Sequence, residues 1–211
     1  MSAERTDYHP VKFLDGLEGY NHMVLLYDKQ EYGDLIIARY FLNGLKKGES
    51  CIYFTSDDPE GVEKRLSAAG IDVERYKRAG SLRVYRPGEP AKGSKSPLSI
   101  LKGIRKDATK GMKPPFRFAG RTIMDTESKE GMLTGMAVEK TGQEHFAEFE
   151  NAQMCFYDVR KIEPSRRDEW ITGLLKNHHQ VIYASRPDKA VAFETSLLES
   201  EEESSLAEEM G

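Results

Sequence analysis

Six short apolar runs are spaced along the chain, and stretches with helical periodicity separate them. The runs are residues 23–27, 51–55, 81–85, 116–123, 153–157 and 180–184. A strand that is buried on both faces reads as a continuous apolar run, and such strands occur in parallel sheets that helices cover. We therefore predict an α/β fold with a mostly parallel central sheet flanked by helices.

Helix start and stop signals lie between the apolar runs. Asp58 can cap a helix whose first residue is Pro59, and Ser96 with Pro97 repeats this signal. Helices are predicted over residues 34–46, 58–70, 96–111, 127–149 and 165–177. Strands and helices thus alternate along the chain.

The composition excludes several classes of protein. A formal charge of −4 and a pI near 5.8 argue against a nucleic-acid binder, although residues 86–113 are locally basic. We interpret that stretch as a solvated loop and helix face. No apolar run is long enough to span a bilayer, and the first ten residues lack the apolar centre of a signal peptide. The expectation is a cytoplasmic protein with no membrane partner.

The cysteines and histidines do not indicate a metal site. Cys51 and Cys155 each lie in an apolar run, where a small buried side chain fits, and no CxxC spacing occurs. His178 and His179 are adjacent, so their rings point in different directions and do not easily share an ion. We predict neither a metal nor a disulfide.

Both ends of the chain are predicted to lie outside the main domain. Residues 1–17 are expected to be an N-terminal extension and residues 187–211 a C-terminal helix with an acidic tail. Four apolar residues would form one stripe of that helix: Ala190, Phe193, Leu197 and Leu198. The tail is either a solubilising segment or a helix for docking and self-association, and the sequence leaves both open.

The first apolar run is followed by the turn DKQEYGD, residues 28–34, and then by a helical pattern. This order forms the phosphate-binding corner of many nucleotide-binding proteins, where glycines admit the phosphates and a lysine reaches them. Here the turn has one glycine, three carboxylates and no lysine before Ser or Thr, so phosphate would be repelled. The acids have an alternative, structural role, because they stabilise a helix N-terminus.

Four sequence blocks resemble a known family. They are GYNHMVLLYDKQEY (19–32), GLKKGESCIYFTSDDPEGVEKRLSAAGIDV (44–73), MCFYDVRKI (154–162) and LLKNHHQVIYA (174–184). The chain from about residue 18 to 186 resembles the MEDS domain, the methanogen/methylotroph sensory module, a degenerate relative of the KaiC/RecA-like ATPases. One position departs from the family, because Arg121 follows Gly120 where an acid is usual; Asp125 or Glu127 could take that role.

The resemblance implies a three-layer RecA-like domain with a degenerate P-loop. It also implies a sensory and signalling role, with hydrocarbon derivatives or other small organic molecules as ligands and a signalling protein as the output partner. No cofactor and no catalytic residue are expected. We expect a stand-alone sensor or adaptor.

The carboxyl ends of parallel strands meet at one edge of a sheet, where α/β proteins bind ligands. The ligand-binding candidates are His22, Tyr27, Asp28, Lys29, Glu31, Tyr32, Asp57, Asp58, Tyr157 and Asp158. His22 matches the family's characteristic histidine. Asp57 and Asp58 match an acidic pair that activates water in the ATPases, but Asp58 also fits as a helix cap.

Two alternatives stay open. A divergent KaiC-like ATPase would bind ATP and Mg²⁺ through Lys29 and backbone amides. A self-assembling adaptor would form a homo-oligomer through its tail and sheet edge.

Overall fold

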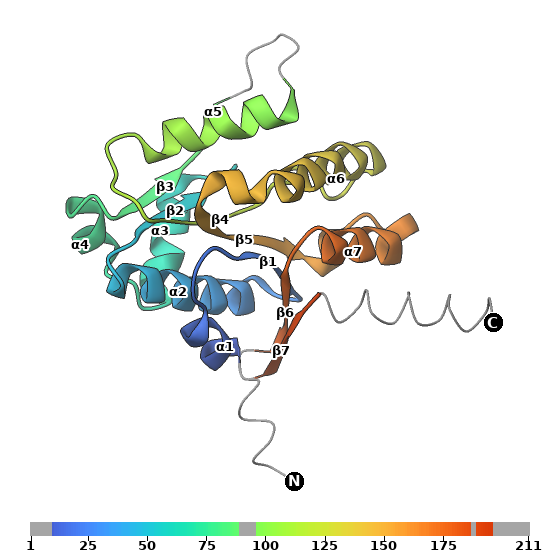
Figure 1. Cartoon of the computed structure of the whole chain (residues 1–211). Helices are drawn as coiled ribbons and strands as arrows, with labels where there is room; N and C mark the ends of the chain where they lie inside the picture. Colours follow the sequence, from blue (N-terminus) through green and yellow to red (C-terminus); the bar gives the residue numbers. More distant parts are fainter. Residues whose placement is uncertain (1–9, 89–95, 187–188, 196–211) are drawn as a thin grey trace, which may run out of the picture.

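The computed structural model describes residues 10–88, 96–186 and 189–195, which form one mostly parallel sheet covered by helices (Figure 1). The strands are β1 (His22–Tyr27), β2 (Ser50–Phe54), β3 (Leu82–Tyr85), β4 (Phe116–Gly120), β5 (Asn151–Asp158), β6 (Gln180–Arg186) and β7 (Lys189–Glu194). Their order is β3-β2-β4-β5-β1-β6-β7, and only β7 pairs in the antiparallel sense. The predicted α/β class is confirmed.

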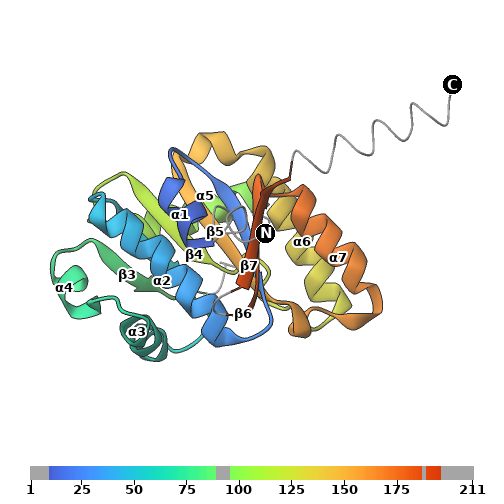
Figure 2. The ribbon, with the colours of Figure 1, turned by 90° about the horizontal axis from the view of Figure 1, so that it is seen from below.

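The helices form two layers on opposite faces of the sheet, as Figures 1 and 2 show together. On one face lie α1 (Pro10–Gly16), α2 (Gln30–Lys46), α3 (Pro59–Ala68) and α4 (Val73–Arg78). On the other face lie α5 (Pro97–Thr109), α6 (Lys129–Glu144) and α7 (Arg167–Lys176). Short 3-10 turns η2 (Phe146–Phe149), η3 (Val159–Lys161) and η4 (Pro164–Arg166) complete the connections.

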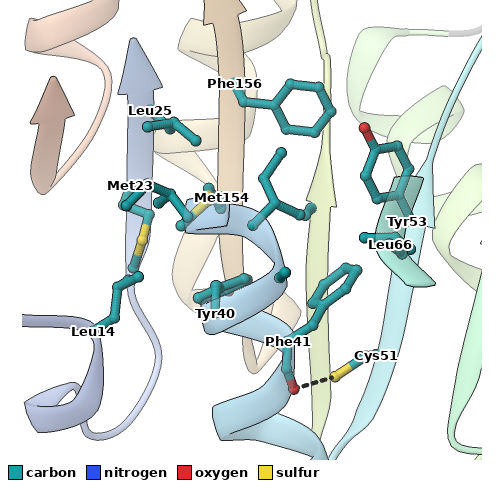
Figure 3. Packing of buried hydrophobic residues seen from close by; sticks show 14 of the residues in the cluster. Leu14, Met23, Leu25, Tyr40, Phe41, Cys51, Tyr53, Leu66, Met154 and Phe156 are labelled. Carbon is teal, nitrogen blue, oxygen red and sulfur yellow. Dashed lines mark hydrogen bonds between the residues drawn. The ribbon is translucent and has the colours of Figure 1, made fainter. Parts of the chain in front are cut away.

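The central strand β1 shows why its sequence reads as a continuous apolar run. All six of its residues are buried, because each face of the sheet is covered. Met23 and Leu25 pack under α2, whereas Val24 and Leu26 face α6 and α7. The side chains under α2 form the larger core, in which Tyr40 of α2 is fully buried (Figure 3).

The predicted helix caps occur in the structure. The Asp58 side chain accepts a hydrogen bond from the backbone N–H of Gly61 and begins α3, and Ser96 does the same for Ser99 and α5. Each cap satisfies a backbone donor that the first turn of a helix leaves unpaired.

Both predictions for the chain ends need correction where the structure describes them. Residues 189–194 form strand β7 rather than a helix, because they pair with β6 and extend the sheet. Leu197 and Leu198 lie outside the described residues. Residues 10–17 are part of the domain and not an appendage, since Leu14 and Leu17 are buried in the core with α2. In the described part of the chain, no helix has the length and apolar character needed to cross a membrane.

Candidate functional site

A crevice lies beyond the carboxyl ends of β1, β2, β4 and β5, and encloses a volume of about 90 Å³. Its lining residues are Tyr27, Gln30, Tyr53, Phe54, Thr55, Asp57, Arg65, Arg121, Thr126, Phe156, Tyr157, Asp158 and Lys161. This is the edge at which open α/β sheets bind ligands. The fold therefore places a mixed aromatic and charged pocket where a ligand site is expected.

Aromatic side chains form the inner wall of the crevice. Tyr27, Tyr53 and Phe156 come from three different strands, and the Tyr53 and Phe156 rings lie 5.4 Å apart between centroids. Burial raises the pKa of Tyr27 to about 12 and raises that of Tyr53 further. Both hydroxyls therefore stay protonated at neutral pH and can donate hydrogen bonds.

Arg65 reaches the crevice from α3, which packs beside the end of β2. Its Nε atom is buried and has no hydrogen-bond partner among the described residues, although the Asp34 carboxylate lies 3.5 Å away. Burial raises the pKa of Asp34. The hydrogen bonds and the positive charge around its carboxylate therefore do not fully offset the loss of water. Arg65 thus brings a positive charge to the crevice, and its Nε atom is paired with the Asp34 carboxylate.

Arg121 and Asp57 occupy the outer rim. The Arg121 Nη2 atom lies 3.6 Å from an Asp57 carboxylate oxygen and donates a hydrogen bond to Ser56 Oγ at 3.3 Å. The Asp57 side chain is 57% exposed, so this ion pair is a solvated one. Arg121 is the residue that departs from the family pattern, and the departure puts a cation at the crevice.

The corner between β1 and α2 is shorter than the sequence predicts. The strand ends at Tyr27 and the helix begins at Gln30, so only two residues connect them and the expected seven-residue turn is wrong. The helix begins earlier in the sequence than predicted, and Glu31 lies in its first turn. An acid is favourable there, because it interacts with the positive end of the helix dipole. Gln30 accepts a hydrogen bond from the Tyr27 hydroxyl at 3.2 Å and donates one to Asp34 at 2.9 Å.

The remaining residues of this corner point away from the crevice. Asp28 accepts hydrogen bonds from the Tyr183 hydroxyl at 3.0 and 3.1 Å. The Lys29 ammonium lies 5.9 Å from the centre of the Tyr32 ring. Neither these residues nor Glu31 line the crevice.

The other candidates divide between the crevice and structural roles. Tyr157 lines the crevice, but its hydroxyl donates to a Glu139 carboxylate oxygen beneath it. Asp158 also lines the crevice, and it is bound by the Arg160 guanidinium at 2.9 and 3.1 Å. His22 lies at the opposite end of β1 and is buried.

The structure thus brings four of the ten candidates together at the crevice: Tyr27, Asp57, Tyr157 and Asp158. Asp58 caps α3 instead. Of the two acids considered as replacements after Gly120, Asp125 accepts hydrogen bonds from the backbone N–H groups of Glu127 and Ser128, and neither acid lines the crevice. Arg65 and Gln30 were not predicted: Arg65 lies within the helical pattern of α3, and Gln30 lies in the turn DKQEYGD, where only the charged residues and Tyr32 were candidates.

Solved structures with the same architecture include two archaeal proteins. A KaiC-like protein from the hyperthermophilic archaeon Pyrococcus horikoshii OT3 matches with a TM-score of 0.59 and 13% identity, over 80% of this chain and 72% of that chain. A second protein from the same organism matches with a TM-score of 0.56 and 11% identity, over 87% and 91%. At these identities the likeness shows a KaiC-like fold.

Comparison with curated proteins gave no match. The sequence profile of the MEDS domain, described as the methanogen/methylotroph, DcmR sensory domain, matches residues 21–179. The matched region includes β1 to α7 and every residue that lines the crevice. The chain therefore belongs to the MEDS family of sensory domains.

Proposed function

We propose that this chain is a non-catalytic sensor that binds a small organic molecule in the crevice and passes the signal to a protein partner. The observation that carries the proposal is the crevice itself, in which the rings of Tyr27, Tyr53 and Phe156 lie with the charged residues Arg65, Arg121 and Asp158 at the carboxyl ends of parallel strands. Apolar walls with a few convergent polar groups are the usual composition of a small-molecule site. In this crevice the aromatic rings supply the apolar part of the lining and polar or charged side chains supply the larger part, so a small ligand with a short apolar body and several polar atoms would fit.

The volume of the crevice limits the size of this ligand. An apolar cavity of about 150 Å³ accommodates benzene, so about 90 Å³ suits a molecule with fewer heavy atoms. Short alcohols, carboxylates and halogenated hydrocarbons are of this size. The volume of the crevice therefore supports a ligand of this size, and the family's sensory role supports ligand binding in general.

The corner between β1 and α2 makes a nucleotide a less suitable ligand than a small organic molecule. A phosphate-binding loop surrounds the phosphates with successive backbone N–H groups over about eight residues. Here two residues join the strand to the helix, and Lys29 lies over Tyr32. We propose that this corner is a degenerate P-loop and that ATP with Mg²⁺ binds weakly or not at all.

Catalysis also lacks support from the acids at the crevice. A general base needs a free carboxylate that faces the reacting group. Asp57 is paired with Arg121, Asp58 caps α3, and Asp158 is held by Arg160. We therefore propose binding without turnover.

A thermal-shift screen tests the proposal. The panel contains short alcohols, carboxylates, amines and halogenated hydrocarbons, with ATP and Mg²⁺ as the comparison ligand. A compound at one hundred times its Kd adds about 2.7 kcal/mol to the free energy of unfolding, which is readily measured as a rise in Tm. We expect a compound with an acceptor atom to stabilise the protein, and ATP to have little effect.

Two arginine variants make the screen specific to the crevice. Arg65→Gln should abolish the stabilisation by the compound found, whereas Arg78→Gln should preserve it, because Arg78 is exposed on α4 and only its own helix backbone receives its hydrogen bond. Strong stabilisation by ATP with Mg²⁺, together with hydrolysis that Asp57→Asn removes, would instead establish the ATPase alternative.

A further inference from the structure

Four potential metal ligands meet in a buried cluster on the α6 and α7 face of the sheet, away from the crevice. They are His22 at the start of β1, Glu139 in α6, Cys155 in β5 and His178 between α7 and β6. Each of these residues is at most 1% exposed. One donor atom from each residue lies within 4.8 Å of all the others.

The two histidine rings are oriented in the way that metal ligands require. The Nδ1 atom of His178 is 2.7 Å from the Leu174 carbonyl oxygen, which can only accept, so this nitrogen carries the proton. The Nδ1 atom of His22 has the same relation to the Gln143 amide oxygen at 2.7 Å. Both Nε2 atoms therefore present lone pairs to the cluster, the arrangement that hydrogen bonds to the far ring nitrogen impose on metal-bound histidines.

The lone pair of His178 is unpaired in the described part of the chain. Its Nε2 atom is buried without a hydrogen-bond partner among the described residues, and a Glu139 carboxylate oxygen lies 3.7 Å from it. That oxygen is also an acceptor when Glu139 is ionised. A buried acceptor without a partner destabilises the folded protein. A cation bound between His178 Nε2 and the Glu139 oxygen would remove this destabilisation.

Three of the six separations between ligand atoms are close to those around a tetrahedral ion, and the others do not exceed 4.8 Å. Zinc–ligand bonds of about 2.0–2.3 Å place neighbouring ligand atoms of a tetrahedron about 3.3–3.8 Å apart. The Cys155 sulfur lies 3.6 Å from His22 Nε2 and 3.8 Å from Glu139 Oε2. Together with the 3.7 Å between Glu139 and His178, these distances differ from the ideal values by a few tenths of an ångström.

Neighbouring side chains support the carboxylate and the sulfur. The Tyr157 hydroxyl donates to one Glu139 oxygen and leaves the other directed at the cluster. The Gln153 amide donates to the Cys155 sulfur at 3.1 Å. Arg105 is the nearby cation, and it is occupied by the oxygens of Asn151 and Gln153.

We propose that His22, Glu139, Cys155 and His178 form a binding site for one divalent first-row transition ion. Zn²⁺ fits best, because it is tetrahedral and accepts nitrogen, sulfur and oxygen together. Binding displaces the Cys155 proton to solvent, and the thiolate with the Glu139 carboxylate then balances the two charges of the ion. A closed set of four ligands indicates a structural ion that ties β1, β5, α6 and the start of β6 together.

Cobalt spectroscopy on the full, tag-free chain tests this site. After treatment with a chelator, the protein is titrated with CoCl₂ and then with ZnCl₂. We expect one Co²⁺ per chain, a thiolate-to-cobalt charge-transfer band in the near ultraviolet, and the intense visible bands of tetrahedral cobalt. Zn²⁺ should displace the cobalt and raise Tm. The absence of the charge-transfer band in the wild-type chain would overturn the proposal.

The second cysteine provides a matched control. Cys51 is equally buried but lies on the opposite face of the sheet, under α2. Cys51→Ser should keep the charge-transfer band, and Cys155→Ser should lose it. The reverse result would show that the metal binds elsewhere. If Cys155→Ser does not fold, Gln143→Leu serves instead: it removes only the hydrogen bond to His22 and should weaken Zn²⁺ binding about 10-fold to 100-fold, whereas unchanged affinity would contradict the assigned orientation of His22.

Discussion

The Trp170 indole donates a hydrogen bond to the Glu163 carboxylate, and tryptophan fluorescence can follow the loss of this contact. Hydrogen bonds from Ser165 and from the Trp170 indole hold the pKa of Glu163 at about 2, below its ordinary value of 4.5. A lowered pKa in the folded state stabilises the protein above the unfolded-state pKa, and this contribution disappears as the pH falls from about 4.5 to about 2. Trp170 is the only tryptophan, so its fluorescence reports on this region.

We expect Glu163→Gln to flatten the pH dependence of stability in this acidic range. The measurement is urea denaturation followed by Trp170 fluorescence at several pH values between about 5 and about 2. The wild-type free energy of unfolding should fall more steeply than that of the variant. Parallel curves for the two proteins would show that Glu163 titrates normally.

Arg117 and Glu49 form a nearly buried ion pair beneath α2. The Arg117 side chain is 4% exposed, and its Nε and Nη2 atoms donate to Glu49 at 2.6 and 3.0 Å. Removing one partner leaves the other charge buried and unpaired, so we expect Glu49→Gln to reduce the free energy of unfolding by about 3 kcal/mol. Glu63→Gln breaks the more exposed pair with Lys77 and should cost less than about 1 kcal/mol. Equal losses in urea denaturation would refute this ranking.

Within α6, two glycines have opposite roles. A Cβ atom at Gly135 would lie 2.6 Å from Ile123 Cγ1, too close for any real contact, whereas one at Gly142 would lie 3.9 Å from its nearest neighbour. We expect Gly135→Ala to destabilise the protein by about 1–3 kcal/mol through overpacking. Gly142→Ala should stabilise it by up to about 1 kcal/mol, because alanine favours the helix. Thermal unfolding of the two variants would reveal shifts in Tm of opposite sign.

The elements themselves could be predicted where burial decides the pattern. Strands buried on both faces leave continuous apolar runs, so all six parallel strands were located. Residues 189–194 were predicted as helix because Ala190 and Phe193 are three residues apart, a spacing that fits one face of a helix. The same six residues also fit a strand, in which successive side chains point to opposite faces of the sheet. Pairing with β6 decided the outcome, and that contact is not encoded locally.

At the scale of the whole molecule, β7 closes the sheet beside β6. Ala192 of β7 is buried, and Phe193 packs against the core under α6 and α7. We expect deletion of residues 188–211 to lower the free energy of unfolding by at least about 2 kcal/mol, the value of one large buried apolar side chain. Deletion of residues 196–211 keeps β7 and its pairing with β6, so we expect a much smaller effect. Light scattering on both proteins also tests whether this end supports self-association.

The two sites differ in how far the sequence could predict them. Tyr27 ends β1 and Asp57 lies in the loop that follows β2, so the parallel topology alone places both at the crevice. The buried cluster was inaccessible to this reasoning, because His22 and His178 are 156 positions apart and approach only through the packing of β1 beside β6. The sequence analysis asked whether the adjacent residues His178 and His179 could share an ion. In the structure the histidine beside His178 is instead His22, from the other end of the chain.

The position of β1 in the sheet has a consequence for biosynthesis. β1 emerges from the ribosome before any other strand, yet its neighbours β5 and β6 begin only at residues 151 and 180. Its largely apolar side chains therefore stay uncovered by neighbouring strands until nearly the entire domain has been translated, and pairings of such large sequence separation form slowly. We therefore expect this domain to depend on chaperones during its synthesis more than a protein whose first strands pair with each other.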